Sequence, residues 1–197
     1  RHLRLKILLT GRSGQVGTAL QRSLAPLGNV IAFDRKGLDL LAIGDTIVNA
    51  RPEIIVNTAA YTAVDRAERE QDMAFAVNAR AVENLAREAK SLDALLVHFS
   101  TDYVFDGEKP APYVETDAPN PLGVYGRSKL DGERAIAASG CRHLIFRTSW
   151  VYGPSGRNFV HAIIAAAKTK PELRVVDDQR GAPTSSDAIA DAVAQVL

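Results

Sequence analysis

The sequence predicts an α/β fold, an open and doubly wound parallel sheet with helices on both faces. Three observations lead to this fold class. Strand-like and helix-like segments alternate along the 197 residues, the strand-like segments are nearly continuous apolar runs, and Gly or Asp stands at their carboxyl ends. Such runs are typical of parallel strands that are buried on both faces, and the alternation is typical of repeated β-α-β units.

Turn residues separate the elements of the first half. A short apolar run that ends at Gly or Asp predicts a buried strand, whereas apolar residues three and four apart predict a helix. Gly11 ends the first strand, Asp34 ends the second, and Pro52 separates a weak helix from the third. The expected elements are a strand over 5–10, a helix over 16–27, a strand over 29–33, a helix over 43–50, a strand over 54–57 and a helix over 72–91.

The second half continues the alternation around one long loop. Residues 105–122 are rich in Pro, Asp and Gly and predict that loop. The other expected elements are a strand over 94–99, a helix over 124–139, a strand over 143–146, a helix over 158–168, a short strand over 173–176 and an amphipathic helix over 185–197. The last helix reaches the final residue without a capping Gly or Pro, so we expect the natural chain to continue.

The composition excludes several classes of protein. Lys and Arg number 24 against 23 Asp and Glu, and the net charge is +1. This balance gives no bulk attraction to nucleic acid or to an anionic membrane, and no uncharged stretch is long enough for a membrane-spanning helix. Cys141 is the single cysteine, which excludes an internal disulfide and a cysteine-cluster metal site, and suits a cytoplasmic location.

Three glycines, Gly11, Gly14 and Gly17, stand at the turn between the first strand and the first helix. Glycine lets a dinucleotide pyrophosphate approach bare backbone, and the free N–H groups at the start of the helix attract phosphate. Asp34, at the end of the second strand, occupies the position where an acid holds the adenosine ribose. Together they predict a Rossmann-like nucleotide site, and packing glycines in a protein without a nucleotide are the alternative.

The residues around Asp34 give opposing indications of the cofactor. An aspartate at this position repels a 2′-phosphate and favours NADH. Arg35, and Arg12 inside the glycine loop, attract that phosphate and favour NADPH. The sequence therefore predicts NADPH or NADH without a choice between them, and solvated loop charges are the simpler interpretation of Arg35 and Lys36.

A tyrosine and a lysine four residues apart, Tyr125 and Lys129, open a predicted helix. Residues at this spacing share one helix face, and an ammonium beside a phenol lowers the pKa of the phenol. Tyr125 is thus a candidate general acid or base, and an exposed helix pair is the alternative. Ser100 and Thr101 follow the fourth strand, where a hydroxyl can polarise a substrate carbonyl or simply cap a turn.

These motifs together resemble the extended short-chain dehydrogenases/reductases, and within them the dTDP-4-dehydrorhamnose reductase family. The segments that carry the resemblance span almost the whole chain, namely 14–17, 57–65, 100–107, 121–129, 146–152 and 181–184. The resemblance implies reduction of the C4 keto group of dTDP-4-dehydro-6-deoxy-L-mannose by NADPH or NADH, which gives dTDP-L-rhamnose.

The resemblance also implies a role for each matching position. Tyr125 gives a proton to the sugar O4 as hydride reaches C4, Lys129 assists it and binds the ribose, and Thr101 polarises the carbonyl. The implied cofactor-binding residues are Gly11, Arg12, Gly14, Gln15, Val16, Asp34, Arg35, Asp39, Leu40, Ala59, Ala60, Tyr61, Asn78, Ser100, Tyr125 and Lys129. The implied substrate-facing residues are Thr62, Val64, Asp102, Tyr103 and Trp150, although core packing is an alternative for Trp150.

Departures from related families narrow the prediction. The related 4,6-dehydratases carry Thr-Asp-Glu where residues 101–103 read Thr-Asp-Tyr, which favours simple reduction. The first helix lacks the early glutamate of metal-bridged dimers, so we expect neither such a dimer nor a bound metal. The resemblance implies a nucleotide-sugar as the partner, and we expect a monomer or a homodimer. Cys141 and His143 fit roles in the core better than catalytic ones, and His98 is expected to be buried and hydrogen-bonded.

The domain prediction follows from the length of family members, which run further than this chain. Residues 1–197 are expected to form one NAD(P)-binding domain that carries the catalytic residues. The substrate lobe is expected to be largely absent and only partly represented, by about 148–197. Two other functions stay open: a non-catalytic regulatory subunit like that of methionine adenosyltransferase, and another sugar-nucleotide 4-ketoreductase, epimerase or dehydratase.

Overall fold

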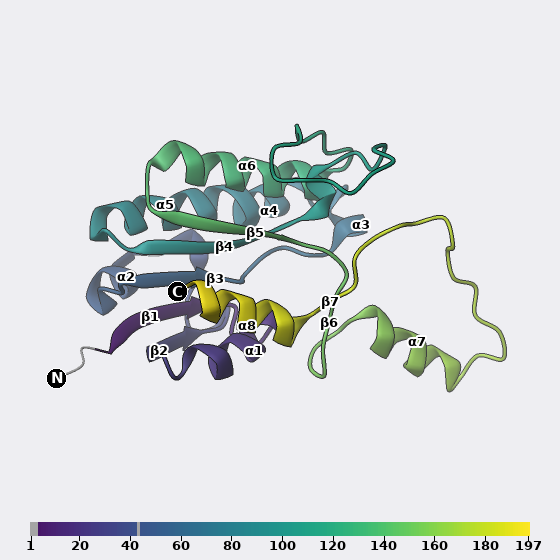
Figure 1. Ribbon diagram of the computed structural model, residues 1–197, viewed down its shortest axis with the longest axis horizontal. Helices are drawn as coiled ribbons and strands as arrows, with labels where there is room; N and C mark the ends of the chain where they lie inside the picture. The colour runs from purple at the N-terminus through teal and green to yellow at the C-terminus, as the bar shows by residue number, and fades with distance from the viewer. Residues whose placement is uncertain (1–3, 43) are drawn as a thin grey trace.

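A five-stranded parallel sheet forms the centre of the computed structural model, which describes residues 4–42 and 44–197. Its strand order is β2-β1-β3-β4-β5, and helices cover both of its faces (Figure 1). The predicted fold class is therefore confirmed. The strands are β1 (Leu5–Thr10), β2 (Gly28–Phe33), β3 (Ile54–Asn57), β4 (Leu95–Thr101) and β5 (His143–Thr148).

The helices follow the predicted alternation, with one short helix, α3, that the sequence did not indicate. The α-helices are α1 (Gln15–Leu24), α2 (Gly44–Ala50), α3 (Val64–Ala67), α4 (Gln71–Phe75), α5 (Ala81–Leu92), α6 (Val124–Ser139), α7 (Phe159–Ala167) and α8 (Ser186–Val196). Single turns of 3-10 helix, η1 (Leu40–Ala42) and η3 (Asp102–Val104), precede α2 and follow β4. Both 3-10 turns lie where side chains of the candidate site are expected.

Alternate side chains of the strands form two apolar layers. On one face Leu8 and Ile55 pack against Leu85 of α5 and Ile136 of α6. On the other face the core is formed by strand residues together with α1 and α8, namely Ile7, Leu9, Ala19, Leu20, Leu24, Ile54, Val56, Val97, Ala190 and Val193. Burial on both faces explains why the strands are continuous apolar runs.

The strand order determines where a ligand can bind. The chain passes from β1 outward to β2 and then returns to the other side of β1 to form β3, so its direction reverses between β1 and β3. In open parallel sheets, ligands bind outside the carboxyl ends of the strands at such a reversal. Gly11 and Thr58, which follow β1 and β3, therefore mark the expected place.

The long helix predicted over 72–91 contains a π-helical turn. This turn, η2 (Ala76–Arg80), joins α4 to α5 without a break in the helical path. Asn78 lies in the middle of it and is completely buried. A Cβ on Gly132 would collide with the Asn78 carbonyl oxygen, so the glycine allows α6 to approach the turn closely. π-helical turns occur frequently at functional sites.

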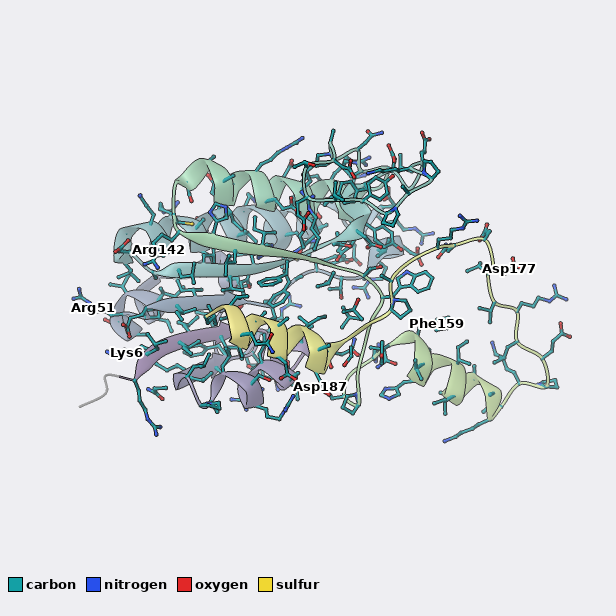
Figure 2. The ribbon with its side chains drawn as sticks, viewed as in Figure 1. Lys6, Arg51, Arg142, Phe159, Asp177 and Asp187 are labelled. Carbon is teal, nitrogen blue, oxygen red and sulfur yellow. The ribbon has the colours of Figure 1, made fainter. Side chains whose placement is uncertain are left out.

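The last part of the chain divides into a packed helix and a projecting segment. Helix α8 packs on α1, where Arg22 lies 3.2 Å from Asp187. Residues 153–183, which include α7, project from the sheet (Figure 1), and none of them is buried. Figure 2 shows Phe159 and Asp177 on this segment, far from Lys6, Arg51 and Arg142 at the ends of the strands opposite the candidate site.

Two sequence predictions in the second half are wrong. Residues 173–176 form no strand, because no neighbouring strand pairs with them there and three of the four are exposed. A two-residue parallel pair forms nearby instead, between β6 (Val151–Tyr152) and β7 (Thr184–Ser185). His143 is exposed rather than in the core, with its Nδ1 2.9 Å from the Cys141 carbonyl oxygen. Cys141 itself is buried, as expected.

Within the part of the chain that the structure describes, no helix is long and apolar enough to cross a membrane.

Candidate active site

The glycine loop after β1 is shaped by close backbone contacts. Gly11 has a φ of +74°, and a Cβ there would lie 2.6 Å from Thr58 Oγ1. A Cβ on Gly17 would collide with the Gly11 carbonyl oxygen, so this glycine lets α1 pass close to the loop. Gly14 is the N-cap of α1 and provides no side-chain cap, and among the described residues no side chain accepts from the first N–H groups of this helix. Backbone donors of this kind suit phosphate.

The side chains that flank the glycines have other partners. Gln15 Nε2 donates to the carbonyls of Val151 and Arg157, and Gln15 Oε1 accepts from Asn158. The Gln15 side chain therefore ties α1 to the segment after β6. Val16 packs into the core beneath the sheet, so only its backbone can face a cofactor.

The loop after β3 is held from below by Asn78. Asn78 Oδ1 accepts from the Tyr61 N–H at 2.8 Å, and Asn78 Nδ2 donates to the Tyr61 carbonyl at 3.0 Å. These paired bonds hold Ala59, Ala60 and Tyr61 beside the glycine loop. The Tyr61 hydroxyl donates to Glu70 Oε2 at 2.6 Å, which raises the pKa of Tyr61.

The acid at the end of β2 forms a local turn. Asp34 Oδ1 accepts from the N–H groups of Lys36 and Gly37 at 2.9 and 3.0 Å, which lowers the pKa of this carboxyl. The nearby Arg12 guanidinium lowers this pKa further. Arg35 is exposed. Further along, Asp39 Oδ1 accepts from the Leu41 N–H and caps η1, and Leu40 packs against the core.

Two hydroxyl residues at the end of β4 are buried but differ in their bonding. The Thr101 hydroxyl donates to Asp102 Oδ1 at 3.1 Å and accepts from the Tyr103 N–H at 3.2 Å, so it caps η3. The other oxygen of Asp102 accepts from the Ser149 hydroxyl at 2.6 Å. Ser100 Oγ is buried and has no hydrogen-bond partner among the described residues.

Tyr125 lies at the start of α6, directly beside Thr101. Burial raises the pKa of Tyr125 to about 12, and Asp102 and Tyr103 add to this rise although the Thr101 side chain opposes it. The ring meets that of Tyr103 edge to face, with 5.7 Å between centroids. The expectation of a lowered pKa is therefore wrong for the cofactor-free protein, because desolvation of the phenolate outweighs other effects.

Lys129 is turned into the protein interior rather than toward the Tyr125 hydroxyl. Its Nζ donates to the Phe99 carbonyl at 2.6 Å and lies 3.2 Å from His98 Nε2. Burial lowers the pKa of Lys129 to about 8, and the Glu133 carboxylate opposes this shift. His98 is fully buried and hydrogen-bonded, as expected.

The expected substrate-facing residues follow the ends of three strands. Tyr103 and Trp150 are each about half exposed, and Thr62 is exposed. Trp150 has a φ of +44°, and Gly181 packs against its indole ring so closely that a Cβ there would lie 2.5 Å from Cε2. Trp150 thus has one covered part and one exposed part. Val64, partly buried, begins α3.

The residues present fit a dinucleotide. The crowded glycines leave bare backbone, α1 starts without a side-chain cap, and Ser100 Oγ is a buried hydroxyl without a partner. A buried polar atom without a partner costs free energy, and a bound ligand can remove this cost. Among the described residues, no group of three or more His, Cys, Asp or Glu could hold a metal ion.

Sequence reasoning missed several residues that shape this site. Glu68 Oε1 accepts from the Val124 N–H at 2.7 Å and so caps the helix that carries Tyr125. A Cβ on Gly126 would collide with the Tyr103 carbonyl oxygen, so Gly126 allows η3 to approach α6. Ser149 fixes Asp102, as described above. No local sequence pattern marks these residues. Ser149 is 47 positions from Asp102, and Glu68 is 56 positions from Val124.

Comparison with known proteins identifies a family. Residues 5–197 match the family described as "RmlD substrate binding domain". A dTDP-4-dehydrorhamnose reductase of Escherichia coli K12 is 48% identical over 98% of this chain and 67% of its own length. A spore coat polysaccharide biosynthesis protein of Bacillus subtilis, SpsK, is 42% identical over 98% of this chain and 69% of its own length. The chain thus spans about two thirds of these relatives.

A solved structure supports the same relationship. The dTDP-4-dehydrorhamnose reductase of Bacillus anthracis in complex with NADP superposes with a TM-score of 0.94 at 38% identity. The match covers 98% of this chain and 70% of that protein.

Proposed function

This chain belongs to the RmlD family of dTDP-4-dehydrorhamnose reductases, and we propose that it reduces the C4 keto group of dTDP-4-dehydro-6-deoxy-L-mannose to give dTDP-L-rhamnose. The observation that carries the proposal is the position of Tyr125. Its phenol lies beside Thr101, the last residue of β4, at the carboxyl edge of the sheet. Relatives at 42–48% identity bear the reductase name, and a similar structure contains NADP.

Tyr125 supplies the proton in this proposal. A pKa of about 12 keeps the phenol protonated at neutral pH, which is the form that a reduction needs. The O–H bond of Tyr125 breaks as O4 of the sugar takes the proton. Thr101 donates to the same oxygen in this proposal, in place of the bond to Asp102 Oδ1 that its hydroxyl makes at 3.1 Å, and so stabilises the negative charge that develops there.

NADPH or NADH, when bound, supplies the hydride that reaches C4 of the sugar. The backbone of the glycine loop and the start of α1 would hold the pyrophosphate, and Asp34 and Arg12 would face the adenosine ribose. Ser100 would bind near the nicotinamide end, where its hydroxyl has a bond to gain. Lys129 would reach the ribose there only after it leaves the Phe99 carbonyl and His98. We assign the loop of Ala59, Ala60 and Tyr61, held by Asn78, to the adenosine side.

The sugar is expected to lie against Tyr103, Asp102 and Trp150. Ser149 fixes the Asp102 carboxylate at 2.6 Å, so its position does not depend on a ligand. The half-exposed ring of Trp150 offers an apolar surface for the deoxysugar. We also propose that the protein is cytoplasmic and acts as a monomer or a homodimer.

The test is a parallel assay of the purified protein with the 4-keto sugar nucleotide and either NADPH or NADH, followed by loss of reduced-nicotinamide absorbance and identification of the product. Formation of dTDP-L-rhamnose supports the proposal, and the two rates show which cofactor the Asp34 and Arg12 pair selects. Another product would assign the chain to a different sugar-nucleotide reaction. Cofactor binding without turnover would favour a regulatory role.

A further inference from the structure

A buried chain of hydrogen bonds runs from β1 through β3 and β4 to Lys129 of α6. The Thr10 hydroxyl donates to Asn57 Oδ1 at 2.6 Å, and Asn57 Nδ2 lies 3.0 Å from His98 Nδ1. His98 Nε2 in turn lies 3.2 Å from Lys129 Nζ. All four side chains are at most 2% exposed. Groups so well shielded from water interact strongly with one another.

The orientation of Asn57 decides which nitrogen of His98 carries hydrogen. Asn57 Oδ1 also accepts from the Ala59 N–H at 3.2 Å, and a backbone N–H can only donate. The oxygen of Asn57 is therefore fixed, and its amide hydrogens face His98 Nδ1. That nitrogen must accept, so the single hydrogen of a neutral imidazole resides on Nε2.

This assignment places an N–H group of His98 against the Lys129 nitrogen. An uncharged amine has a lone pair that accepts this hydrogen and still donates to the Phe99 carbonyl. An ammonium has no lone pair, so it meets His98 Nε2–H as one donor against another. The contact is therefore favourable only when Lys129 is uncharged.

We propose that His98 is a positioning residue for Lys129: Asn57 holds its hydrogen on Nε2, and that hydrogen retains the Lys129 amine in the interior. Protonation of Lys129 breaks this contact and releases the side chain from His98. The role of Lys129 in catalysis rests on the proposed function, whereas the tautomer of His98 does not. The chain ends at Thr10, which is buried, so it positions Lys129 and does not conduct protons from solvent.

The charges around this contact act in both directions. Burial lowers the pKa of His98 well below its usual value, so the imidazole stays neutral, and Lys129 contributes to that shift. On α6, Glu133 favours the ammonium form of Lys129, but its carboxylate is also bound by Arg147 of β5 at 2.6 and 3.0 Å. Tyr125 is neutral on the same helix. The neutral amine is thus accessible near physiological pH.

The direct test is ¹⁵N NMR of the imidazole nitrogens in the cofactor-free protein at about pH 9, where a Lys129 pKa of about 8 leaves the amine mostly uncharged. The four histidines give separate signals, and His98→Gln identifies those of His98. We expect a hydrogen on Nε2 and none on Nδ1. The opposite tautomer, or a charged ring, would overturn the proposal whether or not the protein is a reductase.

A second variant reverses the expected tautomer. In Asn57→Asp the carboxylate can accept from Thr10, from Ala59 and from His98 Nδ1, which moves the histidine hydrogen to Nδ1 and leaves Nε2 as an acceptor for an ammonium. We expect a reversed ¹⁵N pattern and a pKa of Lys129, measured from its ¹³Cε shift, that rises by about one unit, a tenfold change in proton affinity. An unchanged Lys129 pKa with a reversed tautomer would show that His98 does not act on Lys129.

The matched control is His143→Gln, which removes an exposed histidine at the opposite end of β5. Its His98 tautomer and Lys129 pKa should equal those of the parent. If the parent turns over substrate, the pH profile of kcat should shift upward in Asn57→Asp and not in His143→Gln. Absence of turnover in the parent would defeat the proposed function and leave the NMR result to decide the positioning role.

Discussion

Two regions of the molecule differ in how far their apolar side chains are buried. One is the sheet with the helices that cover it, and the other is the projecting segment 153–183. Leu8 of the sheet and Leu85 of the covering helix α5 are completely buried. In the segment, the apolar side chains of α7 stay exposed, with Phe159 at 66% and Ile164 at 51%. The difference shows that apolar composition alone does not define a core. A helix contributes to stability only where a second apolar surface meets it.

The candidate site lies in the first of these regions, the sheet with its covering helices. Tyr125, Lys129 and Thr101 are supplied by α6 and β4, whose other residues form the core. Lys129 is positioned by partners about thirty positions away in the sequence, whereas Thr101 is held by its neighbours Asp102 and Tyr103. Trp150, by contrast, is located where the segment begins, with half of its surface free.

Loss of the proton donor should have the largest effect. Tyr125→Phe removes the hydroxyl that acts as the general acid in the proposed reaction. General acid catalysis contributes roughly 10²–10⁴-fold to a rate. We expect kcat to fall by about that factor while cofactor affinity changes little, as measured by steady-state assay and by fluorescence titration. Tyr113→Phe, a change in the loop after η3, serves as the control. Activity retained in Tyr125→Phe would remove Tyr125 from the proposed mechanism.

A matched pair of truncations compares the two regions directly. Leu85→Ala should lower the free energy of unfolding by about 2–5 kcal/mol, because it leaves a cavity beneath the sheet. Ile164→Ala, on exposed α7, should change it by less than about 0.5 kcal/mol. Urea unfolding followed by circular dichroism measures both. Equal costs would show that α7 is packed in solution.

The buried lysine should make stability depend on pH. The pKa of Lys129 is about 8 in the folded protein against 10.5 for the free side chain, so the unfolded chain binds more protons between these values. The free energy of unfolding should therefore rise by up to about 3 kcal/mol from pH 8 to pH 10.5, relative to Lys129→Met at each pH. If the free energies of unfolding of the parent and of Lys129→Met change equally with pH, the pKa of Lys129 lies near its ordinary value.

The glycine loop should respond less than the proton donor or the buried core. Gly17→Ala introduces a Cβ that collides with backbone, and overpacking of this kind costs about 1–3 kcal/mol. Gly14→Ala meets only the Gly11 carbonyl oxygen, at 3.4 Å, and should cost less. Thermal unfolding and NADPH titration of both variants test the difference. A larger loss in Gly14→Ala would mean that the ligand, rather than packing, demands that glycine.

Much of the sheet and its covering helices could be predicted from the sequence. Continuous apolar runs indicated all five strands, because burial on both faces leaves a simple pattern. The glycine spacing and the pair Tyr125 and Lys129 located the site, since they are local. The predicted strand over 173–176 failed because Val175 and Val176 have β-forming side chains but no strand to pair with. Intrinsic preference does not decide structure without a partner.

The details of the site could not be predicted, for a related reason. Spacing placed Lys129 on the face of Tyr125, but its direction is decided by the Phe99 carbonyl and His98 on another strand. The pKa of Tyr125 depends on burial, which no motif encodes. Glu68 likewise acts on a helix that begins 56 residues later. Each of these effects arises from contacts that exist only after folding.

The π-helical turn at Ala76–Arg80 determines how the side chains of α5 are rotated about the helix axis relative to those of α4. It holds one more residue than an ordinary turn, and each residue of an α-helix advances the direction of the side chains by about 100°. Removal of one residue there would leave the chain helical but rotate α5 against α4. Val82 and Leu85 would then turn away from the sheet, and Asn78 away from Tyr61. A deletion that the helix itself could accommodate would thus disturb the core and the loop together.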